Sequence, residues 1–98
     1  PGLPGLPQTA LYQNYPNPFN PTTTIRYSLA VPNEVRLGIY NLKGQLVKEL
    51  VREHLPAGDH QSVWDGSDSA GKQVGSGIYL YRLQSGDYSK TLKMILVK

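Results

Sequence analysis

Apolar and polar residues alternate with a period of two along most of the chain from residue 22 onward. Successive side chains of a β-strand point to opposite faces, so this period predicts strands that bury one face. The helical period, with apolar residues three and four positions apart, is largely absent. Six segments carry the strand pattern, at residues 22–29, 33–41, 46–53, 60–64, 78–84 and 89–97.

Turn signals rich in Gly, Pro, Asn and Asp separate these segments, and a seventh, short edge strand is predicted near Gln73-Val74. Six or seven short strands with such regular turns favour an all-β, immunoglobulin-like antiparallel β-sandwich. The only tryptophan, Trp64, ends one of the predicted strands. We expect it at the centre of the core.

Segment 46–53 fits two interpretations. Its apolar residues would also line one side of a helix, and its Lys, Glu and Leu residues favour helix. We predict a strand, because a hairpin turn around Gly44 precedes the segment and the turn at 55–60 ends it within one strand length.

The last two predicted strands carry apolar residues on both faces. An antiparallel sheet with one solvated face should be polar on that face, so we expect another segment to cover it. The candidate is NYPNPFNP, residues 14–21, called the strap below. Its prolines lack N–H donors and keep the preceding residues extended. We predict that Tyr15 and Phe19 attach the strap to the sandwich over the second apolar face.

Length and composition exclude several classes of protein. A chain of 98 residues provides one domain, which we place at 9–98 after a Pro/Gly-rich linker at 1–8. The absence of cysteine excludes disulfides, thiolate zinc sites and a cysteine nucleophile. The basic residues are dispersed and the net charge is only +3, which argues against nucleic acid as a partner. The longest apolar run, 94–97, is far too short to insert into a bilayer.

Residues 66–73, GSDSAGKQ, match most of a phosphate-binding loop. Gln73 occupies the position of the Ser or Thr that would ligate magnesium, and the following VGSG does not begin a helix. We therefore interpret this stretch as a turn-rich connection. His54 and His60 have no orienting acid or nucleophile nearby in sequence. The chain is predicted not to be an enzyme and to need no cofactor.

The same connection also resembles a calcium loop in part. Asp65 and Asp68 could supply carboxylate ligands, but Ala70 and Ser76 stand where that loop requires glycine and glutamate. Aspartates that bond the backbone of their own turn are the favoured interpretation, with a loose calcium site as the alternative.

Four blocks of the chain are specific in combination and occur in a fixed order. They are YPNPFNPTTTIRYSL, VRLGIYNLKGQLVKEL, LPAGDHQSVWDGSDSAGKQVGSGIYLYRL and the closing KMILVK. From about Gln13 to Lys98 the chain resembles the type A C-terminal sorting domain of the type IX (Por) secretion system. It also resembles the immunoglobulin-like domain of the flagellar hook-capping protein.

The resemblance to the sorting domain implies a function. Such a β-sandwich lies at the C-terminus of a secreted precursor from a Bacteroidetes-like bacterium and carries an N-terminal cargo domain. The family is exported to the periplasm, recognised by an outer-membrane translocon, and commonly cut by a sortase-type protease as the cargo is attached to the cell surface. Motif positions carried over from the family are Pro16, Asn17, Pro18, Gly77, Tyr79, Arg82, Lys93 and Lys98.

We therefore predict a sorting module that docks through its last strand and a nearby surface with Tyr79 and Arg82. A structural immunoglobulin-like spacer is one alternative. A carbohydrate-binding module that uses surface tyrosines such as Tyr12 or Tyr88 is another.

Overall fold

The computed structural model describes residues 8–98, which form seven β-strands and no helix. No membrane-spanning helix is therefore found in this part of the chain. The prediction of an all-β immunoglobulin-like sandwich is confirmed. The strands are β1 (Ala10–Leu11), β2 (Thr23–Leu29), β3 (Asn33–Tyr40), β4 (Leu46–Leu55), β5 (Gly58–Trp64), β6 (Gly77–Ser85) and β7 (Tyr88–Leu96).

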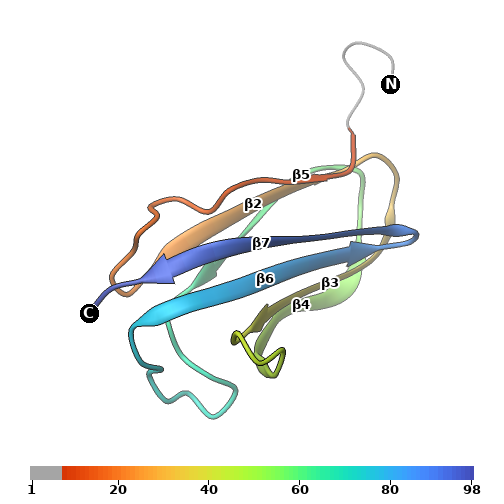
Figure 1. Ribbon diagram of the computed structural model, residues 1–98. Helices are drawn as coiled ribbons and strands as arrows, with labels where there is room; N and C mark the ends of the chain where they lie inside the picture. The colour runs from red at the N-terminus through yellow and green to blue at the C-terminus, as the bar shows by residue number, and fades with distance from the viewer. Residues whose placement is uncertain (1–7) are drawn as a thin grey trace.

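The strands form two antiparallel sheets that face each other across the core (Figure 1). The smaller sheet has the order β1-β2-β5 and the larger one has the order β4-β3-β6-β7. Hairpins connect β3 to β4 and β6 to β7, whereas β2–β3 and β4–β5 pass from one sheet to the other. The chain enters at Gln8 and ends at Lys98, at opposite ends of the sandwich.

The core lies between the inner faces of the sheets and centres on Trp64. This side chain is fully buried, as predicted, and its ring contacts Tyr79 edge-on at a centroid distance of 5.4 Å. Phe19 lies on another side of the indole at 5.7 Å. The indole N–H donates to the backbone C=O of Ser67 (2.8 Å), so its one polar group is satisfied. Aromatic packing therefore joins the strap, β5 and β6.

Strand β4 explains the helix-like spacing in its sequence. Its register against β3 shifts twice, which leaves Val47 and Leu50 without direct partners in the ladder. Each extra residue in a strand reverses the face of the residues that follow it. Val47, Leu50 and Val51 consequently all pack against the core, although a regular strand would turn neighbouring side chains to opposite faces. The strand prediction is correct.

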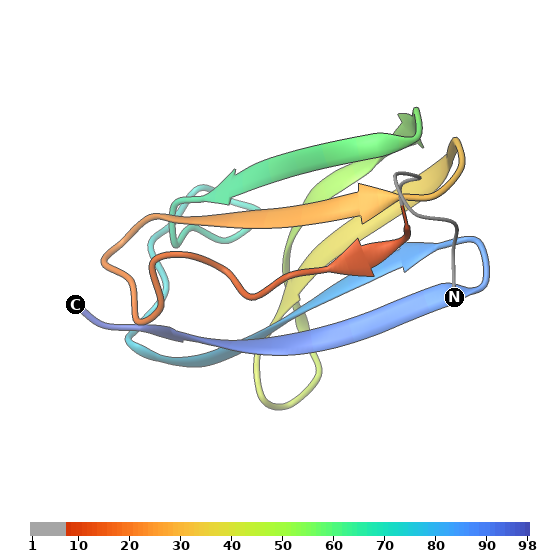
Figure 2. The same ribbon diagram turned by 90° about the horizontal axis from the view of Figure 1, so that it is seen from above.

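The strap does not cover the outer apolar face, so that part of the prediction is wrong. It lies between β2 and β7 and closes the gap between the two sheets at their edges (Figure 2). Phe19 is buried with 2% of its surface exposed, whereas Tyr15 is 78% exposed and contributes no side chain to the core. The three Xaa–Pro bonds of the strap are cis.

Two further sequence predictions concern short segments. Near Gln73-Val74 there is only an isolated bridge from Gln73 to Ser67, and the seventh strand is β1, which pairs with β2. The predicted linker at 1–8 lies outside the described residues except for Gln8, whose C=O accepts a hydrogen bond from the hydroxyl of Ser28.

The burial of Phe19 and the exposure of Tyr15 give a test with a matched pair of substitutions. Phe19→Ala should lower the unfolding free energy by about 3–5 kcal/mol, because it empties a site beside Trp64. A loss of that size lowers the Tm of a domain of this length by more than about 10 °C. Tyr15→Ala should change the unfolding free energy by no more than about 0.5 kcal/mol. Thermal unfolding followed by near-UV circular dichroism measures both, and equal shifts would contradict the placement of the strap.

Candidate functional site

The last strand, β7, is an edge strand that pairs with β6 along one side only. At its C-terminal end, the strap bonds to the other side. The N–H of Phe19 donates to the C=O of Ile95 (3.0 Å), and the N–H of Val97 donates to the C=O of Phe19 (2.9 Å). Phe19 is thus a one-residue parallel addition to the end of the strand.

Two side chains continue this cover toward the middle of β7. The Asn17 Oδ1 atom accepts the N–H of Ile95 (2.9 Å), and the Gln13 Nε2 group donates to the C=O of Lys93 (2.9 Å). Backbone groups of every second residue face the same side of a strand, so those of Thr91 and Ser89 also point outward from the sheet edge. No hydrogen bond from residues 8–98 reaches them. The edge is therefore closed at Ile95 and open from Ser89 to the N–H of Lys93.

A buried tyrosine holds the beginning of the strap in place. The Tyr81 hydroxyl donates to the C=O of Tyr12 (2.9 Å) and accepts the N–H of Asn14 (2.8 Å). Burial raises the pKa of Tyr81 to about 12, against a smaller opposing effect of the bond from Asn14. The Asn14 side chain is itself buried and donates to the Thr23 hydroxyl (2.9 Å) and to the C=O of Pro16 (3.2 Å). These bonds give hydrogen-bond partners to the C=O groups of Tyr12 and Pro16 and to the N–H of Asn14.

The predicted surface formed by Tyr79 and Arg82 is wrong, because the two residues lie on opposite faces of β6. Tyr79 points into the core against Trp64, and its hydroxyl donates to the C=O of Gly75 (2.7 Å). Three positions along a strand reverse the face. Tyr79 is therefore a structural residue, and only Arg82 faces outward.

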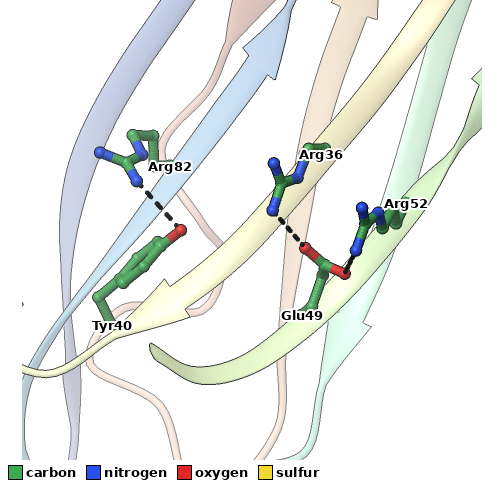
Figure 3. Close-up of polar contacts among 5 residues, drawn as sticks. All are labelled: Arg36, Tyr40, Glu49, Arg52 and Arg82. Atoms are coloured by element: carbon green, nitrogen blue, oxygen red, sulfur yellow. Dashed lines mark hydrogen bonds and ion pairs between the residues drawn. The ribbon is translucent and has the colours of Figure 1, made fainter. Parts of the chain in front are cut away.

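Arg82 lies over the ring of Tyr40, with 4.8 Å between the guanidinium carbon and the ring centroid. One guanidinium N–H donates to the Tyr40 hydroxyl (3.2 Å; Figure 3). Gly38 makes room for the ring, since a Cβ atom there would come within 3.0 Å of the Tyr40 hydroxyl. Gly38 thus lets the Tyr40 ring lie over β3, and this ring orients Arg82 on the neighbouring strand β6.

The other predicted motif residues gather around the end of β7. Gly77 has a φ of 153°, which favours glycine at the start of β6. The N–H of Lys98 donates to the Ser76 hydroxyl (3.0 Å), so the end of the chain is tied to the residue before β6. The side chains of Lys93 and Lys98 are exposed. Of the strap motif, Asn17 bonds β7 directly, and Pro16 and Pro18 flank it.

The aspartates of the loop after β5 serve their own turns. The Asp65 Oδ1 atom accepts the N–H and the hydroxyl of Ser67, and the Asp68 Oδ1 atom accepts the N–H of Ala70 (3.0 Å) and Lys72 (2.9 Å). The hydroxyl of Ser67 lowers the pKa of Asp65, with its N–H as the next cause. No group of three or more Asp, Glu or His residues that could hold a metal ion occurs within 8–98. The favoured turn interpretation agrees with these bonds.

The surface tyrosines named for carbohydrate binding differ in exposure. Tyr12 is exposed on the outer face of the smaller sheet, beside Arg26 at 5.9 Å, and lines a hollow with Asp59 and Gln61. Tyr88 is half-buried, and its hydroxyl accepts the N–H of Leu11 (3.1 Å). Only Tyr12 is placed to contact a ligand.

Comparison with known proteins bears on this arrangement of strands and edge. The family model of the FlgD Ig-like domain matches residues 20–91, nearly three quarters of the chain. The chain belongs to the FlgD Ig-like domain family. The predicted resemblance to the immunoglobulin-like domain of the flagellar hook-capping protein is thereby confirmed. No curated protein sequence matches the chain.

Solved structures show the same fold in proteins with different contexts. PorU from Porphyromonas gingivalis, in a dimeric latent form, gives a TM-score of 0.73 at 24% identity, over 93% of this FlgD Ig-like domain and 9% of PorU. PorZ, an essential surface component of the type IX secretion system of the same bacterium, gives 0.63 at 21%, over 90% and 11%. FlgD from Pseudomonas aeruginosa gives 0.60 at 21%, over 92% and 72%. The chain thus corresponds to a small part of PorU and PorZ, and at these identities the similarity concerns the fold.

The strap anchor gives a prediction that depends on pH. Tyr81→Phe should lower the unfolding free energy by about 1–3 kcal/mol at neutral pH, because the buried N–H of Asn14 and the partly buried C=O of Tyr12 lose their partner. In the wild type the hydroxyl ionises near pH 10 when unfolded and near 12 when folded. The wild type therefore loses stability as the pH rises from 10 toward 12, and the gap to the variant narrows.

Urea unfolding at several pH values measures this gap. Tyr15→Phe, at an exposed tyrosine, serves as the matched control and should track the wild type throughout. A gap between Tyr81→Phe and the wild type that stays constant through this alkaline range would contradict the buried, neutral state of the hydroxyl.

Proposed function

We propose that this FlgD Ig-like domain is a non-catalytic sorting and attachment module of a type IX secretion system. It would direct an N-terminal cargo through the outer-membrane translocon to the cell surface, where a sortase-type protease acts on the junction. Two observations support this role: the resemblance of four sequence blocks to the type A sorting domain, and the common fold with PorZ, itself a surface component of such a system. The observation that carries it is the partly open edge of β7.

An open edge is a recognition element because its backbone groups can pair with an added strand of another protein. In this domain the strap confines such pairing to the first part of β7, from Ser89 to Lys93. The lysines at 90 and 93 lie within this stretch and hinder unspecific pairing between copies. A partner that adds a strand here meets the unpaired N–H and C=O groups of Thr91 at the centre.

The spacer alternative is favoured by one finding, membership of the FlgD Ig-like family. A spacer needs no partner at the β7 edge, so changes to that edge should not alter export. For the carbohydrate-binding alternative, the support is the hollow beside Tyr12. Measurable affinity of the domain for a polysaccharide, lost in Tyr12→Ala, would favour it.

Deletion of the last six residues, the obvious test for a terminal signal, also damages the core. Met94 and Leu96 are fully buried, so a chain without them loses core packing as well as the motif. A substitution that changes only the outward edge separates recognition from folding.

Thr91→Pro is such a substitution. It removes an N–H that bonds neither β6 nor the strap and places a ring on the open edge, so the fold should persist while an incoming strand is blocked. The partner's strand would lose about one or two hydrogen bonds to this edge, so we expect surface delivery of a fused reporter to fall about tenfold. The assay is protease accessibility of the reporter on a bacterium with a type IX secretion system.

Two control variants complete this experiment. Thr91→Ala keeps the backbone donor and should be delivered like the wild type. Lys90→Pro removes the backbone N–H of a residue that pairs with Leu83 on β6, so this variant should have a lower Tm. Normal delivery of a folded Thr91→Pro chain would exclude recognition through this edge and would favour the spacer.

A further inference from the structure

Apolar side chains gather on the outer face of the larger sheet, at the end where β6 begins and β7 ends. Ile78 and Ile95 are direct neighbours across the two strands and are 38% and 37% exposed. Leu80 follows on the same face of β6 and is half-buried, while Val97 follows Ile95 at 48% exposure. Nothing in residues 8–98 covers them. We call this cluster, together with Leu42, the outer patch.

Leu42 reaches the patch from the β3–β4 hairpin loop, residues 41–45, which projects beyond the sheet (Figures 1 and 2). It lines one hollow together with Ile78, and Gly44 of the same loop lines a second hollow with Leu80. The Asn41 Oδ1 atom accepts the N–H of Lys43 (2.9 Å) and of Gln45 (3.0 Å), which fixes the loop. Leu42, 65% exposed, is thus presented by an ordered turn.

The border of the outer patch is basic. Lys43 lines the first hollow, Arg82 lines the second, and Lys93 lies directly opposite Leu80. No Asp or Glu lines either hollow. Glu49, on neighbouring β4, is already held between two arginines, Arg36 at 3.4 Å and Arg52 at 3.9 Å (Figure 3).

Arg82 does not use all of its hydrogen-bond donors within residues 8–98. Its Nε atom is buried and has no hydrogen-bond partner within the described chain, and no carboxylate of residues 8–98 forms an ion pair with its guanidinium. Tyr40 takes only one N–H from it. Because Nε is buried, an acceptor supplied from outside would bond the terminal guanidinium N–H groups that Tyr40 does not use.

The position of the patch leaves it accessible. It lies around the C-terminal end of the sandwich, whereas Gln8, through which any preceding part of a longer protein is attached, lies at the opposite end (Figure 1). The strap passes between the sheets and not over this face. Exposed apolar clusters with a polar border are typical of protein interaction sites.

We propose that the outer patch docks a protein surface with an apolar centre and carboxylates around it. The proposal deepens the proposed function, on which it rests, by assigning a chemistry to the partner in the export or attachment apparatus. Carboxylates match the basic border, and one of them can pair with the terminal N–H groups of Arg82. The hollow that Arg82 lines is bordered by Gly44 of the β3–β4 loop. A side chain that protrudes from a protein partner can enter this hollow, whereas a flat lipid surface cannot.

Photocrosslinking tests this in the full chain with a reporter, in a bacterium that has a type IX secretion system. A benzoylphenylalanine replaces Ile95 in the patch or, as the matched control, Val63, which is 54% exposed on the other sheet. We expect a crosslink to a protein from position 95 only, with Asp or Glu beside the apolar residues at the linked site. Combining Arg82→Gln with Lys93→Gln should reduce the yield by about tenfold, as expected for two border charges, whereas Lys72→Gln should not.

Every other outcome overturns the proposal. Crosslinking that is absent at 95, equal at 63 or insensitive to the double substitution removes the docking face. A crosslink to a second copy of the chain assigns the patch to self-association. Charge-dependent cosedimentation of the purified chain with phosphatidylglycerol vesicles, without a protein crosslink, assigns it to a membrane surface.

Reporter delivery is scored in the same cells, so this proposal and the sorting role fail separately. Normal delivery with no crosslink at position 95 removes only the docking face. A chain that is never delivered but gives the charge-dependent crosslink retains the docking face and loses the sorting role. Thermal unfolding of the purified double variant confirms that these outward-facing substitutions preserve the fold.

Discussion

Phe19 is held both by its side chain and by its backbone, and the arrangement of the whole domain depends on this. Its ring lies against Trp64 in the core, while its N–H and C=O bond the end of β7. The segment before it pairs with β2, on the opposite sheet. A chain without cysteine has no disulfide to join its sheets, and here the aromatic contact and two hydrogen bonds join them. Between its two attachments the strap bends, with a cis bond before each of its three prolines.

This closure divides β7 into two parts with different properties. The inner face of the strand belongs to the core from Leu92 to Leu96, through Leu92, Met94 and Leu96. Along the edge, the strap occupies the last part and leaves the first part for another strand. On the outer face, apolar residues meet a basic border. The same nine residues therefore stabilise the domain on one side and offer backbone and side-chain contacts on the two others.

Much of the fold follows from the period-two pattern and the turn residues. Strands β2 to β7 lie where the sequence predicts them, and Trp64 is in the core. The helix-like spacing of β4 is the result of two register shifts, which single-residue patterns do not reveal. β1 has only two residues, too few to show a period.

The candidate site was less predictable, because it depends on which face each residue takes. Tyr15 and Phe19 have similar side chains and are four residues apart, yet only Phe19 enters the core. Alternation along β6 places Tyr79 and Arg82 on opposite faces, which a strict count of the strand positions would have shown. The bonds of Tyr81 to Asn14 and Tyr12 join positions 67 and 69 residues apart in sequence, and no local pattern indicates them.

The chain enters the sandwich at one end and leaves it at the other. Tension applied between Gln8 and Lys98 is therefore directed along the strands, and the parallel contact of Phe19 with β7 is loaded lengthwise. Bonds that are loaded in this direction must break together, whereas a strand peeled from its end breaks them one at a time. Forced unfolding is governed by the height of such a barrier. Tension between the two ends of this domain therefore meets bonds that resist together, and the sandwich can transmit the load along its strands.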